Sequence, residues 1–187
     1  MRDLVDVVRE HMDITMSTKI DACQRNNGPT DLMPMMIWIS ADDTTNLAIV
    51  DGKVHAADYM PKALSLIYKQ SPKVIIFMSE SLGKALTSET ELDQFVNSHQ
   101  PGDLEKLHTK YGPLSGIQEL IAFNAIDMTN GSQVQGILTF AYDDKGIPVF
   151  NEPDIQEIPT SLIERANISS IFNAFYKFTL EEKSNLN

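Results

Sequence analysis

Apolar residues recur at two different periods along this chain, and the change of period separates expected helices from expected strands. The first segment, residues 3 to about 22, has the spacing of one helix face, with apolar positions three or four residues apart. These positions are Val5, Val8, Met12, Met16 and Ile20. The Asn-Asn-Gly-Pro run that follows predicts a loop over residues 26–31. We therefore expect an amino-terminal helix.

The next segment predicts a hairpin, a helix and a buried strand. Residues 35–40 and 47–50 are apolar runs of strand length joined by a polar turn, which is typical of two antiparallel strands. Residues 58–70 carry an amphipathic helical pattern that a Ser-Pro pair ends. The strand 73–78 has no polar alternation between Val74 and Met78, which is typical of a strand covered on both faces.

The last third of the chain predicts an antiparallel meander. Strands are expected at 117–127, 133–142 and 147–150, because turn sequences containing glycine separate them. Pro148 places the third strand at a sheet edge. Before the meander, capping and apolar patterns predict helices near 88–96 and 103–108. After it, they predict a loop over 151–159 and an aromatic-rich helix from residue 161.

These elements predict one α+β domain over residues 1–187, with a frayed tail at 180–187. Its sheet is mixed, comprising the N-terminal hairpin, a crossover helix to a central strand and a C-terminal antiparallel meander, and helices flank it. The mixed sheet follows from the helix 58–70, because a crossover of that length usually joins parallel strands. The element order is also similar to that of profilin- or roadblock-like sandwiches if residues 84–116 form an insertion.

Composition narrows the function classes. The 187 residues include 15 basic and 26 acidic side chains, giving a net charge of −11 and a pI near 4.7. Such a charge repels phosphate backbones and anionic lipids, so we expect neither nucleic acid nor membrane as a partner. A single cysteine, Cys23, excludes an internal disulfide framework and a cysteine-rich zinc site. No apolar run has the length of a membrane span, and the amino terminus lacks a signal-peptide core, so we expect a cytoplasmic protein.

Glu80 is the residue whose position most strongly suggests chemistry. It follows the strand 73–78 directly, and ligands bind beyond the carboxyl ends of such strands in open α/β sheets. A partly desolvated carboxylate there has the environment that suits proton transfer. The alternative is a structural role, as the partner of Lys84 in a salt bridge or as a cap.

Two further residues complete the candidate site. Ser81 lies in Ser-Glu-Ser-Leu-Gly, which approaches the G-x-S-x-G nucleophile elbow but has Ser79 at the first glycine. His55 begins His-Ala-Ala-Asp, whose place at an expected helix start is similar to the H-A-E box of zinc deaminases. That family's P-C-x-x-C motif and its glutamate are missing, so we expect His55 to be a loop or cap residue. Neither a cofactor nor a metal is expected.

The sequence leaves two functions open. One is a non-enzymatic interaction or regulatory module that binds an unknown protein partner or itself. Such a homodimer would form through the meander edge or through the aromatic C-terminal helix. The other is a small hydrolase with a site at the end of the strand 73–78, formed by Glu80 and Ser81 with His55 as a further candidate.

Overall fold

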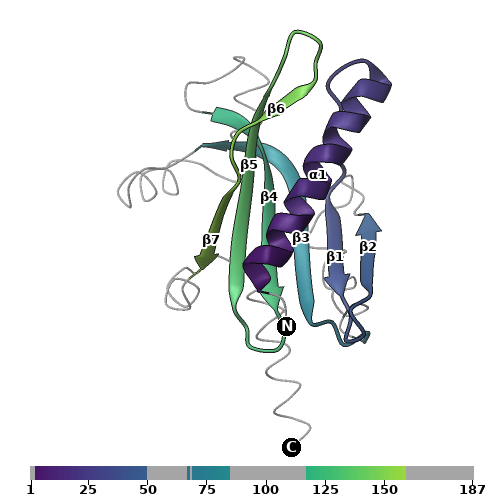
Figure 1. The fold of residues 1–187 in the computed structure, drawn as a ribbon, viewed down its shortest axis with the longest axis vertical. Coiled ribbons are helices and arrows are strands. Elements are labelled where there is room, and N and C mark those ends of the chain that lie inside the picture. Colours follow the sequence, from purple (N-terminus) through teal and green to yellow (C-terminus); the bar gives the residue numbers. More distant parts are fainter. Residues whose placement is uncertain (1–2, 50–66, 68, 85–116, 159–187) are drawn as a thin grey trace, which may run out of the picture.

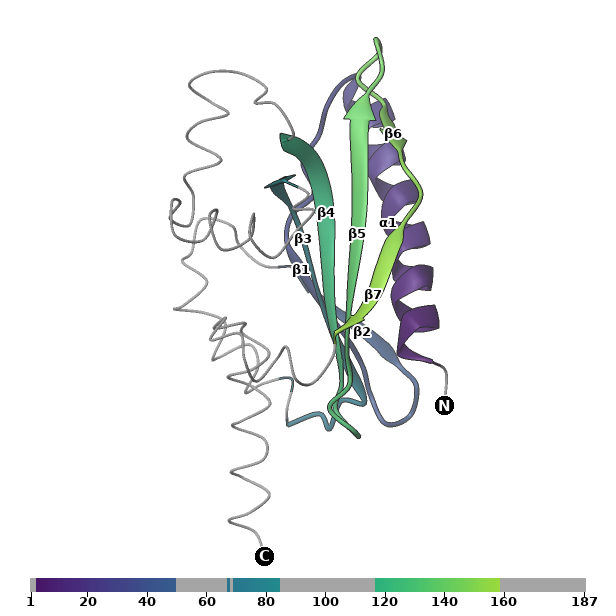
Figure 2. The same ribbon diagram turned by 90° about the vertical axis from the view of Figure 1, so that its left-hand side faces the viewer.

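The fold is given by a computed structural model that describes residues 3–49, 67, 69–84 and 117–158. One long helix, α1, lies across one face of a seven-stranded sheet (Figure 1). Seen from the side, α1 and the sheet form two layers (Figure 2). The expected helices at 88–96, at 103–108 and from residue 161 fall outside the described residues, as does nearly all of the one at 58–70.

Helix α1 spans Leu4–Asn26, so the expected helix is confirmed and extends about one turn further. Asp3 caps its start, because the carboxylate accepts a hydrogen bond from the Val5 N–H at 3.1 Å. Asn27 ends it in the left-handed conformation, with φ at 54°. The expected loop after the helix is confirmed, and it returns the chain toward the sheet.

In the first half of the chain, the strands expected at 47–50 and 73–78 have different bounds in the structure. Strand β1 covers Met35–Ile39 and pairs with β2, Thr45–Ile49, in the expected hairpin. Strand β3 runs from Val74 to Lys84, so the prediction that this strand ends near residue 78 was wrong. Its polar second half remains a strand because every residue from Val74 to Lys84 has a partner in the neighbouring strand β4.

The meander follows the expected boundaries closely. Strand β4 covers Ile117–Asp127 and β5 covers Gln133–Tyr142, as predicted. Strand β6 is Pro148–Phe150, at the sheet edge where its proline was expected. The region predicted as a loop contains a further strand, β7, Asp154–Ile158, which pairs with the other half of β5. Between β6 and β7, residues 151–153 face only residues 138–139 of β5, which is a bulge of one residue.

The strand order is β2-β1-β3-β4-β5-β6, with β7 beside β6 on the same edge of β5, and every pairing is antiparallel. The mixed sheet predicted from the sequence was therefore wrong. The crossover rule applies to strands that become neighbours, whereas β1 lies between β2 and β3 and pairs with both. Strands β2 and β3 do run in the same direction, but they do not touch as a parallel pair.

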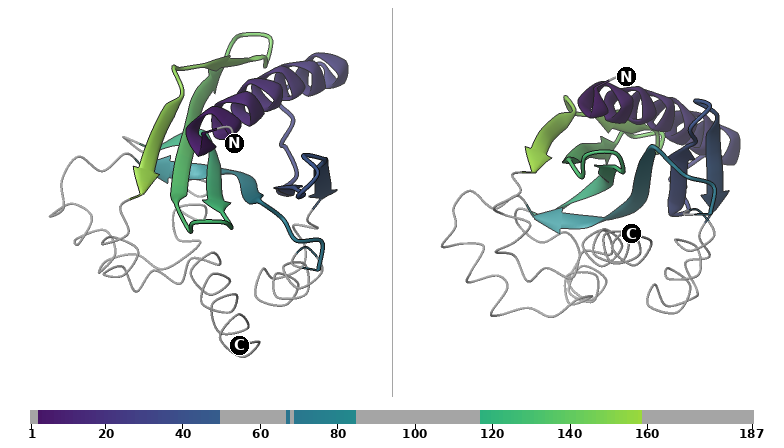
Figure 3. Two further views of the ribbon diagram at one scale, coloured as in Figure 1. Left: turned by 60° about the horizontal axis from the view of Figure 1, so that its bottom comes forward. Right: turned by 90° about the horizontal axis from the view of Figure 1, so that it is seen from below.

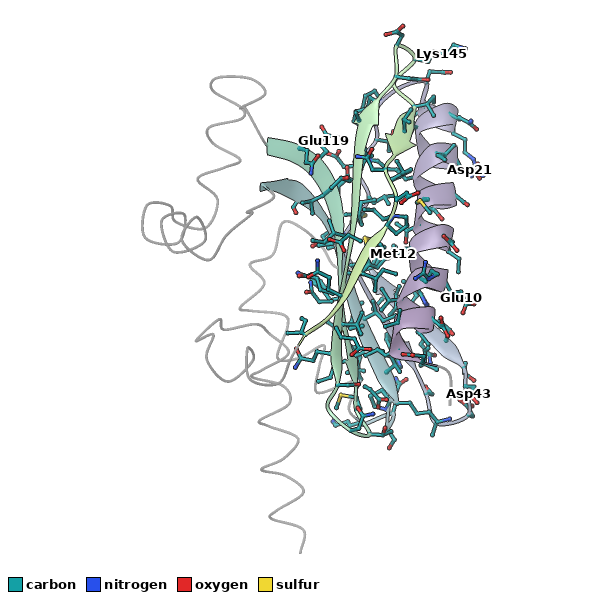
Figure 4. The ribbon with its side chains drawn as sticks, turned by 60° about the vertical axis from the view of Figure 1, so that its left-hand side comes forward. Glu10, Met12, Asp21, Asp43, Glu119 and Lys145 are labelled. Carbon is teal, nitrogen blue, oxygen red and sulfur yellow. The ribbon has the colours of Figure 1, made fainter. Side chains whose placement is uncertain are left out.

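The core lies between α1 and the sheet. Val8 and Met12 of α1 pack against one face, which includes Ile76 of β3 and Phe123 of β4. Gly136 of β5 lies directly against α1, because an added Cβ atom there would lie 2.8 Å from the Met12 sulfur. Figure 4 shows Met12 pointing from α1 to the sheet. Burial of such side chains contributes about 1.5–3 kcal/mol each.

The opposite face of the central strands is also buried. Met36, Trp38, Ile75 and Ile126 alternate with the core residues along their strands and are all less than a tenth exposed. The sheet therefore buries both of its faces at β1, β3 and β4, as the unbroken apolar run of β3 predicted. The views along the sheet in Figure 3 show α1 on only one of these two faces.

Candidate functional site

Glu80 lies on the face of β3 that α1 covers. Side chains alternate between the two faces of a strand, and Glu80 falls in phase with Ile76 and Met78 of the core. Ser81 is out of phase, so its exposed side chain lies on the opposite face. The two residues belong to a continuous strand paired with β4, and the sharp turn of a nucleophile elbow is absent at Ser79–Gly83.

Both carboxylate oxygens of Glu80 accept hydrogen bonds. Oε1 lies 2.5 Å from the ammonium nitrogen of Lys19 on α1, and Oε2 accepts from the backbone N–H of Leu32 at 2.8 Å. The Glu80 side chain is 11% exposed and that of Lys19 is 0% exposed. Glu80 therefore joins three segments: helix α1, the loop after it and strand β3.

Lys19 is held in place by groups on three sides. Besides Glu80, its ammonium donates to the carbonyl oxygen of Thr30 at 2.7 Å. It also lies 5.0 Å from the ring centroid of Phe140 and 5.4 Å from that of Tyr142, within the range of cation–π attraction. A buried ammonium needs such partners, because an unpaired buried charge is strongly destabilising.

The local sequence explains how a lysine becomes buried. Lys19 lies four residues after Thr15 and four before Cys23, both buried, so it belongs to the stripe of α1 that faces the sheet. Its long apolar stem follows that stripe, and the ammonium reaches β3 and β5 beyond it. The apolar spacing that predicted the helix did not mark Lys19, because the buried stripe also contains the polar residues His11 and Thr15.

The electrostatics of the cluster favour a protonated lysine. Burial alone lowers the pKa of Lys19, but the hydrogen bond to Glu80 and the interaction with Tyr142 outweigh it and raise the pKa above 10.5. Burial raises the pKa of the Tyr142 phenol above 10.0; Lys19 opposes that shift, and Glu119 adds to it. The Tyr142 hydroxyl is close enough to Lys19 for this interaction but does not meet hydrogen-bond geometry. A lysine in this state is a fixed positive charge and not a nucleophile.

Of the three candidates from the sequence, the structure places two, and these two lie on opposite faces of β3. Glu80 faces α1, Ser81 faces away from it, and His55 lies outside the described residues. Their catalytic assignment remains a prediction. Glu80 does form a salt bridge, as its structural alternative supposed, but the partner in the structure is Lys19 and not the Lys84 named from the sequence.

The described residues contain neither a cluster of metal ligands nor a helix that could span a membrane. In residues 3–49, 67, 69–84 and 117–158, no three His, Cys, Asp or Glu side chains are grouped so that they could hold a metal ion. Among the described helical residues, none form a segment both long and apolar enough to cross a membrane. Comparison with known protein families, with curated proteins and with solved structures finds no match to this chain.

Proposed function

We propose that this chain is a non-enzymatic interaction or regulatory module that acts in the cytoplasm as a single domain. One observation carries the proposal: Glu80, the residue with the strongest suggestion of chemistry, has both of its oxygens occupied by a lysine and a backbone amide. A carboxylate used in this way fixes the position of α1 on the sheet. A reacting group at Glu80 would have to compete with the Lys19 ammonium and the Leu32 amide for the carboxylate oxygens.

The acidic composition supports the same proposal. A net charge of −11 favours attraction to basic protein surfaces and speeds such encounters at low ionic strength. The partner is an unidentified protein or a second copy of the chain. Nucleic acids and anionic membranes carry the same sign of charge as the protein and are not expected to bind.

The experiment is in-cell cross-linking of the tagged chain, followed by reconstitution of any cross-linked pair from purified components. We expect a partner that binds the purified chain at micromolar concentration, or self-association seen by gel filtration with light scattering. A chain that remains monomeric at high micromolar concentration and yields no pair that can be reconstituted would contradict the proposal.

The alternative is a small hydrolase that uses Ser81, with Glu80 and His55 as assisting groups. The exposure of Ser81 on β3 is the observation that supports it, because a nucleophile must be accessible. A fluorophosphonate probe decides between the two functions. We expect no labelling of the unchanged chain; labelling that disappears in Ser81→Ala would establish the hydrolase and refute the module.

A further inference from the structure

The two outer edges of the sheet differ in how they are protected against strand addition. Edge strands expose unpaired backbone groups, and proteins protect them with charges, prolines and bulges. The β6–β7 edge has all three: Pro148, Pro153, charged residues in and before β7, and the bulge at 151–153. At the other edge, the strand Thr45–Ile49 contains neither a charged residue nor a proline.

The pairing of β1 with β2 shows which backbone groups face outward. The Ser40 N–H donates to the Thr44 carbonyl at 2.9 Å, so these two residues form a hydrogen-bonded pair of the ladder. Hydrogen-bonded and non-bonded pairs alternate along an antiparallel ladder. The register then directs the N–H and C=O groups of Thr45, Leu47 and Ile49 away from β1. No described strand pairs with this side of β2.

The same residues present apolar side chains. Leu47 is 55% exposed and Ile49 is 61% exposed, and both lie in register with the core-side residues Ile37 and Met35 of β1. Met33, 53% exposed, precedes β1 at the end of the strand where Ile49 lies. In Figure 1, β2 forms the right-hand edge of the sheet, and α1 crosses the more central strands. The β2 edge thus combines open backbone groups with an apolar row on one face.

We propose that the β2 edge, Thr45–Ile49, binds an extended segment of a partner protein as an added strand. The segment carries apolar residues at alternate positions opposite Thr45, Leu47 and Ile49, and basic residues elsewhere. This proposal deepens the proposed function, on which it rests. Backbone hydrogen bonds supply affinity in such complexes, and the alternate side chains supply specificity.

Charge selects this occupant over a second copy. Asp42 and Asp43 lie in the turn at one end of β2, where Lys73 offsets only one of the two charges. The chain also carries −11 overall, so a basic segment is attracted and another copy is repelled. Figure 4 shows Asp43 at the tip of this hairpin. The length of β2 also favours a short peptide segment over a second copy. Standard interfaces use roughly 20–30 residues a side, whereas a five-residue edge matches a short peptide.

The probe is a fluorescein-labelled synthetic peptide, Lys-Val-Lys-Val-Lys-Val-Lys, measured by fluorescence anisotropy. Its controls are the acidic peptide Glu-Val-Glu-Val-Glu-Val-Glu and a block peptide of the same composition, Lys-Lys-Lys-Lys-Val-Val-Val. We expect the alternating basic peptide to bind at least about tenfold more tightly than either control, and less tightly as salt is added. Equal binding of the basic and block peptides would show attraction to charge alone and would overturn the strand-addition proposal.

Variants of the chain test whether the peptide binds at the β2 edge. Leu47→Lys adds a positive charge, which repels the basic peptide, and removes an apolar contact. We expect it to weaken binding of the basic peptide at least about tenfold. Val149→Lys is the matched control, because Val149 is 61% exposed on the opposite edge. Leu47→Pro removes an outward N–H and blocks strand pairing, at a position where an edge strand tolerates proline. Circular dichroism verifies that each variant is folded, and Leu47→Lys decides the outcome if Leu47→Pro is not.

Amide hydrogen exchange tests the register independently. A saturating basic peptide should protect the amides of Thr45, Leu47 and Ile49, while those of Asn46 and Ala48, already directed to β1, change little. Protection of the β6–β7 edge instead would refute the assignment.

Failure of this site is distinguishable from failure of the proposed function. A reconstituted partner that binds Leu47→Lys as tightly as the unchanged chain overturns the β2 site and leaves the interaction function intact. If the unchanged chain is a dimer and Leu47→Pro is a monomer, then the occupant of the β2 edge is a second copy and the proposal of a basic segment is refuted. In contrast, fluorophosphonate labelling of the unchanged chain that is lost in Ser81→Ala would refute the interaction function itself.

Discussion

The ion pair between Lys19 and Glu80 gives the sharpest prediction for stability. Three variants define the test: Glu80→Leu, Lys19→Met and the double variant that combines them. Leucine and methionine keep much of the volume of the original side chains while removing the charges. The single variants each leave one buried charge without its partner, whereas the double variant leaves none.

The expected costs differ because the two groups differ in exposure. Glu80→Leu leaves an ammonium that is 0% exposed with only the Thr30 carbonyl and two rings, and breaking a buried pair in this way costs about 3–5 kcal/mol. Lys19→Met leaves a carboxylate that is 11% exposed and still bonded to the Leu32 amide, so we expect about 1–3 kcal/mol.

The double variant should recover most of this loss. Replacing a buried ion pair by apolar side chains is often close to neutral, and the methionine sulfur can pack against the rings of Phe140 and Tyr142. The Leu32 N–H loses its acceptor, which costs about 1 kcal/mol. We therefore expect the double variant within about 2 kcal/mol of the unchanged chain, with a coupling energy of at least about 2 kcal/mol.

The assay is urea unfolding at neutral pH, followed by far-ultraviolet circular dichroism, with the slope of free energy against urea compared among variants. The matched control is the pair of Lys73 and Asp43, which are 3.1 Å apart but 32% and 78% exposed. Its double-mutant cycle should give a coupling below about 1 kcal/mol. Single-variant costs at the buried pair that simply add, or a coupling no larger than that of the surface pair, would refute the reasoning.

Two further predictions concern packing and pH. Gly136→Ala places a Cβ atom 2.8 Å from the Met12 sulfur and should lower the free energy of unfolding in urea by about 1–3 kcal/mol. The control Gly28→Ala, where an added Cβ has no atom within 4 Å, should change it by less than about 0.5 kcal/mol. Equal costs for the two variants would contradict this packing. The raised pKa values of Lys19 and Tyr142 stabilise the fold fully below about pH 10, and this stability should be lost as the pH rises through their folded-state values. Tyr142→Phe should therefore reduce the alkaline loss in unfolding experiments, and an unchanged pH profile would argue against the phenol's contribution.

Local patterns predicted most of the strand positions. The boundaries of β4 and β5 match the prediction because the alternation of their apolar residues and the intervening turn are encoded within a few residues. Asp127, for example, accepts bonds from the Thr129 amide and hydroxyl in that turn. The strand β7 was missed because its core-side face includes Ile155 with charged or polar neighbours, and only pairing with β5 makes it a strand.

The sequence indicated only part of the cluster around Glu80. Position and residue type singled out Glu80 as a carboxylate needing explanation, but its partner lies 61 residues earlier in the chain. Lys19 lies outside the set of apolar residues that predicted the helix, and no local rule distinguishes a lysine directed to a buried partner from one directed to water. The described structure likewise separates Ser81 from Glu80, because one residue along a strand changes the face.

By itself, the sequence determined the periods of its apolar residues, its turns and its charge. These fix which segments can be helix or strand, since periods of 3.6 and 2 are properties of neighbouring residues. Only the tertiary structure decided that β1 lies between β2 and β3, that β3 continues to Lys84, and that Lys19 meets Glu80. Strand order, strand length and charge pairing depend on free energies shared between distant segments. These contributions arise from contacts that form only in the folded chain.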